Sequence, residues 1–347
     1  MDILVATYNM SNVGGAQNYT YAIITELLRL GHNVEYFTFK KGIVSEKTEK
    51  LGVKFLSKNR YDLIIANHRP VIWQLFQYGY TVQTCHGVLK YEMPSWCADY
   101  HVCVSAYQKE FFAEKGIECE LIVNGIDCSR FYPEMPVNKK LTTVLSLCHS
   151  KGANKLIASC CKELNLTFKT FDKITNNVWD IEKEINKADL VIGVGRSLYD
   201  AMACGRPVIS YDTRFKERSF EGDGYLDKNN IYESLVYNCC GGSARRFFTQ
   251  EDLTGELLKY NADDGLFMRE FAVKELNIRK AVEKYLAIPA GNSNIRKRDA
   301  KAIHLYNEMT TEIFELKKTI TAMKSSRSWR VTMPLRKIAG VLRKFKK

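Results

Sequence analysis

Short apolar runs alternate with longer amphipathic segments along the first half of the chain. Residues 3–7 form an apolar run typical of a strand buried on both faces. A segment of helical periodicity, 18–30, follows and ends at Gly31. Further strand-like runs recur at 34–39, 63–66, 81–84, 100–104 and 120–123. This alternation predicts an α/β domain built on a parallel sheet.

A second series of the same kind follows a polar stretch, 133–140, which we interpret as an inter-domain linker. The expected elements are a strand at 143–147, a helix at 154–164, a strand at 167–171, a helix at 178–186 and a strand at 190–192. We therefore expect two α/β domains, 1–137 and 138–290, with ligands at the carboxyl ends of their strands.

Glycines interrupt the chain directly after the strand at 190–192. Gly195 permits a tight turn, and Ser197 is the predicted N-cap of a short helix at 198–204. A turn that leads into a helix N-terminus offers unpaired N–H groups and a positive dipole end to a phosphate. Arg196 adds a cation, and Asp200 adds a carboxylate that could accept hydrogen bonds from ribose hydroxyls. The alternative is an ordinary βαβ turn capped by Ser197.

The run at 195–210, GRSLYDAMACGRPVIS, resembles the donor-site signature of retaining, GT-B-type glycosyltransferases of family 4. That signature is an acidic residue, seven others, then Glu-Ala-Met-Ala-x-Gly-x-Pro-Val. Asp200 stands at the second acidic position, and Ile192 occupies the first. The chain thus resembles a branch in which a shorter Gly-Arg-Ser turn replaces the first half of the signature.

The resemblance implies a GT-B fold, two Rossmann-like domains facing a cleft, and assigns roles to residues elsewhere in the chain. Gly14 and Gly15 match the glycine loop that lies against the donor phosphates or the acceptor. His86 matches a histidine that hydrogen-bonds the donor sugar, and Lys151 matches a lysine that neutralises the leaving diphosphate. Taken alone, the glycine pair could be only a turn and the histidine only structural.

The family usually has an arginine shortly before that lysine, and residues 146–150 contain none. A departing diphosphate needs cations, because its charge grows as the glycosidic bond breaks. We expect Arg196 to serve, together with the backbone amides of Ser197 and Leu198. No cofactor and no metal are expected.

Three further segments are weaker candidates. The Asn-Gly-Ile-Asp turn at 124–127 matches a family turn and is interpreted as architecture near the hinge. His68 and Arg69 follow a predicted strand and could line the acceptor side. The loop at 238–248, which carries Arg245 and Arg246, either approaches the nucleotide or is a solvated basic loop.

The composition, 46% hydrophobic and 26% charged, is that of a soluble globular protein. None of the eleven cysteines falls in a C-x-x-C pair, and the N-terminus lacks a signal-peptide pattern, so buried reduced thiols are expected. The sequence contains no apolar run long enough to span a membrane.

The net charge of +12 belongs almost entirely to the end of the chain. Residues 295–347 hold 15 Lys and Arg against 4 Asp and Glu, which leaves 36 basic and 35 acidic residues in the first 294. A nucleic-acid-binding function for the whole protein is therefore not supported.

The segment 295–347 is expected to be a helical, basic, amphipathic tail. Apolar residues recur at heptad spacing over 302–323, which predicts either a short coiled coil for self-association or packing on the protein's own surface. Residues 325–347 place apolar side chains on one helical face and basic ones around it, as in a helix lying on an anionic membrane. The alternative is a disordered basic tail or nucleic-acid arm.

These features favour a glycosyltransferase that moves a sugar from a nucleotide-sugar donor to a glycan or lipid-linked acceptor, with retention of configuration. We expect it in surface polysaccharide biosynthesis, cytoplasmic and peripheral on the inner face of the membrane. The rival hypothesis is a non-catalytic, glycosyltransferase-like binding or scaffold subunit.

Overall fold

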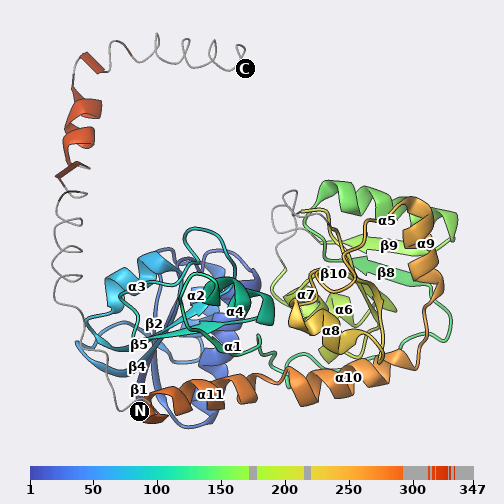
Figure 1. The fold of residues 1–347 in the computed structure, drawn as a ribbon, viewed down its shortest axis with the longest axis horizontal. Helices are drawn as coiled ribbons and strands as arrows, with labels where there is room; N and C mark the ends of the chain where they lie inside the picture. The colour runs from blue at the N-terminus through green and yellow to red at the C-terminus, as the bar shows by residue number, and fades with distance from the viewer. Residues whose placement is uncertain are drawn as a thin grey trace. The chain divides into compact units, whose positions relative to one another are not determined.

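The computed structural model describes residues 1–171, 178–214, 220–291, 312, 315–316, 318–326, 328–329 and 332. Its contacts divide the chain into two compact units, Met1–Ser293 and Asn294–Lys347. The first unit contains both of the sheets described below (Figure 1).

A seven-stranded parallel sheet forms the core of the first half, in the order β3-β2-β1-β4-β5-β6-β7. Its strands are β1 (Asp2–Ala6), β2 (Asn33–Phe37), β3 (Lys54–Phe55), β4 (Tyr61–Asn67), β5 (Gly79–Cys85), β6 (Tyr100–Cys103) and β7 (Glu120–Leu121). The connecting helices are α1 (Gly15–Arg29), α2 (Ile43–Glu49), α3 (Arg69–Leu75) and α4 (Ala106–Ala113).

A five-stranded sheet of order β12-β11-β10-β8-β9 forms the second half, with only β12 antiparallel to its neighbour. Its strands are β8 (Thr143–Ser146), β9 (Thr167–Thr170), β10 (Leu190–Gly193), β11 (Val208–Ser210) and β12 (Gly224–Leu226). Its helices are α5 (Lys151–Glu163), α6 (Ile181–Ile185), α7 (Arg196–Ala203), α8 (Ile231–Val236), α9 (Gln250–Leu258) and α10 (Asp264–Glu275).

The chain returns to the first half through its last described helix in this unit, α11 (Ile278–Gly291). Ile278, Val282 and Tyr285 are buried in the same core as α1 and the first sheet (Figure 1). The predicted division at 137/138 placed this helix in the second domain, because sequence order alone does not reveal a chain that crosses back. The hydrophobic packing therefore groups 278–291 with the first domain.

The predicted strands and helices are present, with differences at helix starts. α1 begins at Gly15 and α5 at Lys151, each three residues before the predicted position. The prediction of Ser197 as an N-cap is wrong, because Gly195 is the cap and Ser197 is already the second helical residue. A glycine in the left-handed region replaces the side-chain cap that a serine would provide.

The cysteines are free thiols, as predicted, and ten of the eleven are buried. No group of three or more His, Cys, Asp or Glu side chains able to hold a metal occurs in the described part of the chain. Likewise, none of the described helices is long and apolar enough to cross a bilayer.

In the second unit, all the residues that the structure describes are helical except Ser326, which lies in a bend. Of the predicted heptad positions, Leu316, Ile320 and Met323 are described, and their side chains are exposed. The other heptad positions (Ala302, Tyr306, Met309 and Ile313) lie outside the described residues, as does the predicted amphipathic face beyond Pro334.

Candidate functional site

A cavity of about 450 Å³ opens at the carboxyl ends of the parallel strands of both sheets. Its lining comes from loops that follow β1, β4, β5 and β7 in the first half and β8, β9, β10 and β11 in the second. Ligands of parallel α/β sheets bind at these ends, because the loops and helix N-termini converge there. The cavity is therefore the candidate binding site.

The N-terminus of α7 forms one wall of the cavity. Gly195 adopts φ 60°, and its N–H donates to the carbonyl of Cys239 at 3.3 Å. The same carbonyl accepts from Ser210 Oγ at 3.1 Å, which fixes the turn against its neighbours. Arg196 and Ser197, the first two helical residues, have no intrahelical acceptor for their N–H groups. This end of α7 can thus donate to an anion.

The amide of Leu198 is not available in the way the sequence suggested. Its N–H donates to Gly195 O at 3.0 Å, and its side chain is completely buried. The amides of Arg196 and Ser197 are therefore the better donors.

Arg196 is held in place by protein groups although it lines the cavity. Its side chain is largely buried, and Nη1 donates to the carbonyl of Gly125 at 3.0 Å. Its Nε lies 3.6 Å from Asp200 Oδ1. Burial lowers the pKa of the guanidinium, and the Asp200 carboxylate opposes that shift. The cation is fixed beside the helix terminus, as expected.

Asp200 also lines the cavity, one helical turn after Arg196. Burial raises its pKa to about 6, although Arg196 opposes the shift. The carboxyl can therefore change its charge close to neutral pH.

Several buried polar atoms in the cavity wall have no hydrogen bond to any described residue. They are Asn18 Oδ1, His68 Nδ1, Asn124 Oδ1, Arg196 Nε and Asp200 Oδ1. Buried polar groups in folded proteins nearly always have partners. Their concentration around one cavity indicates a site that a polar ligand completes.

His86 directly follows β5 and also lines the cavity. Its Nε2 lies 3.1 Å from Asn67 Oδ1, and its ring packs edge-on against Tyr19 with centroids 5.2 Å apart. Burial, with smaller contributions from His68 and Arg196, lowers the pKa of His86 to about 3. The imidazole is therefore neutral at physiological pH.

The glycine pair after β1 borders the same cavity. Gly14 is the N-cap of α1 and Gly15 its first residue. A methyl group at Gly15 would meet no other atom within 4 Å. The open space allows a ligand to approach the backbone closely at this point.

Two of the expected site features are not brought into the cavity wall. Lys151 is the first residue of α5, with an exposed side chain, and does not line the cavity. Arg69 is also outside the lining, whereas His68 is part of it.

The loop at 238–248 contributes to the site through its first residues only. Asn238 and Cys240 line the cavity, whereas Arg246 pairs with Glu256 at 2.6 Å and Arg245 lies over the ring of Phe220. Neither arginine lines the cavity, and Arg246 is bound to a buried glutamate.

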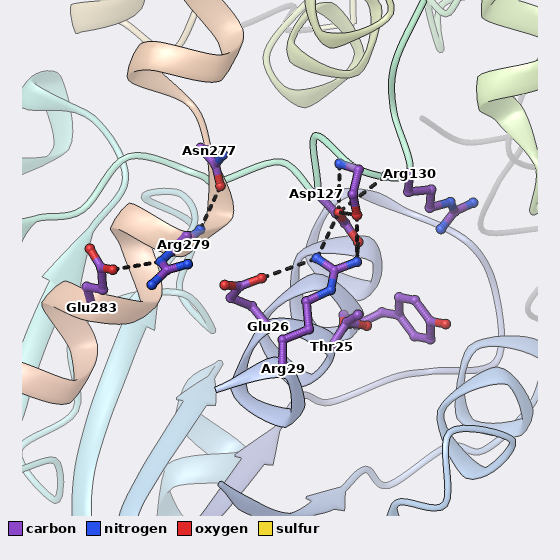
Figure 2. A network of polar contacts seen from close by, with 10 residues as sticks. Thr25, Glu26, Arg29, Asp127, Arg130, Asn277, Arg279 and Glu283 are labelled. Carbon is purple, nitrogen blue, oxygen red and sulfur yellow. Dashed lines mark hydrogen bonds and ion pairs between the residues drawn. The ribbon is translucent and has the colours of Figure 1, made fainter. Parts of the chain in front are cut away.

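The Asn124–Asp127 turn has a double role. Asp127 accepts two hydrogen bonds from Arg29, at 3.1 Å each, as Figure 2 shows. Gly125 accepts from Arg196, and Asn124 lines the cavity. The turn is architectural, as predicted, and also contributes a polar group to the site.

Sequence reasoning missed other lining residues, including Asn18, Glu92, His149 and Arg214. His149 follows β8, which the sequence predicts, so its position after a strand could have indicated it; Arg214 follows β11. Asn18 and Glu92 carried no such signal.

The two halves together have the GT-B fold, as the resemblance implied. No protein-family model matches the chain, and no curated protein matches its sequence. Solved structures do share its fold, among them a glycosyltransferase from Rickettsia africae. That structure has a TM-score of 0.58 and 14% identity, covering 85% of this chain and 98% of the other.

Two further solved structures have the same arrangement. Anabaena Alr3699/HepE, in complex with UDP and glucose, has a TM-score of 0.56 and 15% identity over 83% of this chain and 99% of its own. An alpha-glucosyltransferase in complex with UDP and DNA has a TM-score of 0.54 and 9% identity. The match covers 84% of this chain and 99% of the other. These neighbours are GT-B glycosyltransferases. At sequence identities this low, the similarity shows a shared fold only.

Proposed function

We propose that the protein is a retaining glycosyltransferase similar to family 4, which transfers a sugar from a nucleotide-sugar donor to a glycan or lipid-linked acceptor. The observation that carries the proposal is the cavity wall at α7, where the Arg196 side chain, two amides without an intrahelical acceptor and Asp200 meet. It is supported by the UDP bound to two of the solved structures that share the fold.

In this proposal the N-terminus of α7 receives the donor diphosphate. The amides of Arg196 and Ser197 donate to phosphate oxygens, and the Arg196 guanidinium stabilises the charge that grows on the leaving group. Asp200 accepts from the ribose hydroxyls in its ionised form. Gly14 and Gly15 leave room for the donor or acceptor.

His86 positions the donor sugar as a neutral hydrogen-bonding group. Lys151 supplies a second cation from the start of α5, two residues after His149, which does line the cavity. Retention is inferred from the resemblance of the segment 195–210 to the family signature.

A transfer and hydrolysis assay over a panel of nucleotide-sugars tests the activity. We expect turnover with at least one donor and a loss of more than about tenfold in Lys151→Ala, as for one charge-assisted contact to the leaving group. Lys155→Ala is the matched control, because Lys155 is exposed on the same helix. Equal rates in the two variants would remove Lys151 from the mechanism.

The rival function is a non-catalytic binding or scaffold subunit. It is favoured by Ile192 at the first acidic position and by the lack of an arginine before Lys151. Calorimetry with the same donors separates the two hypotheses, because a scaffold should bind none of them. The stereochemistry of the product, read by NMR, tests retention.

We further propose that residues 325–347 hold the enzyme on the inner face of an anionic membrane, where surface polysaccharides are assembled. The test compares the full chain with a variant lacking 325–347 for binding to anionic vesicles and to DNA. Vesicle binding that is lost on deletion supports the proposal, whereas DNA binding alone contradicts it. Sedimentation of the full chain tests self-association through 302–323.

A further inference from the structure

A line of buried and partly buried hydrogen bonds connects His86 with the start of α1. Thr20 Oγ1 donates to the carbonyl of Ala16 at 2.8 Å, and Asn67 Nδ2 donates to Thr20 Oγ1 at 3.1 Å. Asn67 Oδ1 then lies 3.1 Å from His86 Nε2. Asn67, the last residue of β4, is only 3% exposed.

The direction of each bond in this line follows from its first member. The Ala16 carbonyl can only accept, so the Thr20 hydroxyl donates its single proton to that carbonyl. Thr20 Oγ1 must therefore accept the hydrogen bond from Asn67. Asn67 therefore presents its amide nitrogen to Thr20 and its oxygen to His86. Because an amide oxygen can only accept, His86 Nε2 must carry the proton.

The other ring nitrogen is consequently the unprotonated one. His86 Nδ1 makes no hydrogen bond within the described residues and is not sealed off by protein atoms. Since His86 lines the cavity, this nitrogen is accessible to a ligand there. The edge-on packing of Tyr19 restricts rotation of the ring.

We infer that Asn67 is a positioning residue that fixes His86 as the Nε2–H tautomer, so that Nδ1 acts as a hydrogen-bond acceptor toward the cavity. The ligand group that such a nitrogen recognises is a hydroxyl, or another O–H or N–H donor. The use of that acceptor for a sugar hydroxyl rests on the proposed function, whereas the tautomer does not.

The charged and titratable groups around the ring support a neutral state. Burial disfavours a positive charge on His86 most strongly, and His68, which follows β4, and Arg196, which begins α7, add to this effect. Tyr19 of α1 is itself neutral, because burial raises its pKa to about 12. Because Thr20 fixes the orientation of the Asn67 amide and the ring is neutral, the hydrogen bond to Asn67 favours a single tautomer.

The test is ¹⁵N NMR of the histidine side chains in the full chain, with the His86 signals identified by their loss in His86→Gln. We expect one protonated nitrogen, Nε2, unchanged between about pH 5.5 and 8. An Nδ1–H tautomer, a mixture or a titration in the wild type would overturn the inference. This measurement needs no substrate, so its outcome is independent of the proposed function.

Two variants add a readout that a purely structural role would not change. Asn67→Asp places a carboxylate at Nε2 and should move the His86 titration into the measured range, whereas Asn138→Asp, an exposed control, should not. Thr20→Val removes the fixed acceptor for Asn67 and should yield mixed tautomers, with Thr20→Ser restoring the wild-type spectrum. Unshifted His86 signals in folded Asn67→Asp and Thr20→Val would contradict the inference.

If transferase activity is found, the ratio of kcat/KM for Asn67→Asp to that of the wild type should rise about tenfold as the pH increases through the new His86 pKa. A flat ratio, with the tautomer confirmed by NMR, would show that Nδ1 is not used in turnover.

Discussion

Arg29, at the end of α1, forms two parallel hydrogen bonds with Asp127, from Nη1 to Oδ1 and from Nη2 to Oδ2, each 3.1 Å long (Figure 2). The same carboxylate accepts from the hydroxyl and N–H of Ser129. Two residues before Asp127, Gly125 O accepts from Arg196. The Arg29–Asp127 pair thus anchors the turn that supports the cation of the candidate site.

Replacing Asp127 by Asn should lower the free energy of unfolding by about 1–2 kcal/mol at pH 7, the range for hydrogen bonds to a charged group at a half-exposed arginine. Burial raises the pKa of Asp127, but the bonds from Ser129 and Arg29 outweigh it and hold the pKa below 3.8. This stability is present above the unfolded-state pKa and is lost as the pH falls through the folded-state value. Urea unfolding of the wild type and Asp127→Asn at pH 7 and about pH 3 measures this contribution to the free energy of unfolding.

Glu283→Gln is the matched control for that change, because Glu283 pairs with Arg279 at 2.9 Å on the exposed surface of α11 (Figure 2). Exposed pairs of this kind contribute little. No measurable difference is expected for Glu283→Gln, and an equal loss in both variants would contradict the anchoring role of Asp127.

Gly195→Ala should destabilise the protein by about 1–2 kcal/mol and weaken donor binding, because L-residues disfavour φ near 60°. Its Cβ would also lie 3.2 Å from Asn238 Nδ2. Gly255→Ala in α9 should instead stabilise by about 0.5–1 kcal/mol, since that methyl meets no atom within 4 Å. Thermal unfolding of both variants checks the contrast, and a stable Gly195→Ala would mean that the turn can relax.

Most of the fold could be predicted from the sequence because parallel strands buried on both faces leave uninterrupted apolar runs. β1 and β10 are examples, and the GT-B arrangement followed from the alternation of strands with helices and from the family resemblance. The return of α11 to the first core could not be predicted, because its amphipathic pattern fits either half.

The candidate site was predicted where a motif and a strand end coincide, as for Arg196, Asp200 and His86. It was not predicted where partners come from distant positions. Asn67 acquires its role only through Thr20 and His86, which are 47 and 19 residues away. For Leu198 the predicted role was wrong, because its amide donates to Gly195, the N-cap of its own helix.

Gly15→Ala should leave the stability nearly unchanged and reduce turnover. The new methyl would meet no protein atom within 4 Å and would occupy open space at a residue that lines the cavity. A rise in KM of about fivefold or more, without a change in melting temperature, is the expected outcome in steady-state assays. Full activity in a folded Gly15→Ala variant would show that no ligand approaches this turn.

Donor binding should strengthen as the pH rises through about 6, because the ionised Asp200 carboxylate accepts hydrogen bonds from the ribose hydroxyls more strongly than its protonated form. UDP-glucose is the suitable probe, since its diphosphate lacks the monoester group that titrates near pH 6. Calorimetry should give a dissociation constant about tenfold larger at pH 5 than at pH 7.5, with no such change in Asp200→Asn.

The raised pKa of Asp200 also affects the pH dependence of stability, in the opposite direction to the lowered pKa of Asp127. A carboxyl whose pKa rises on folding, from 3.8 to about 6, favours the folded state below pH 3.8, and this contribution is lost as the pH rises through 6. Asp200→Asn should therefore be about 1–3 kcal/mol more stable than the wild type at pH 7.5, with the gap closing toward pH 4. Greater stability together with weaker donor binding at pH 7.5 would identify Asp200 as a group kept for function. A less stable variant would instead show that its pairing with Arg196 maintains the fold.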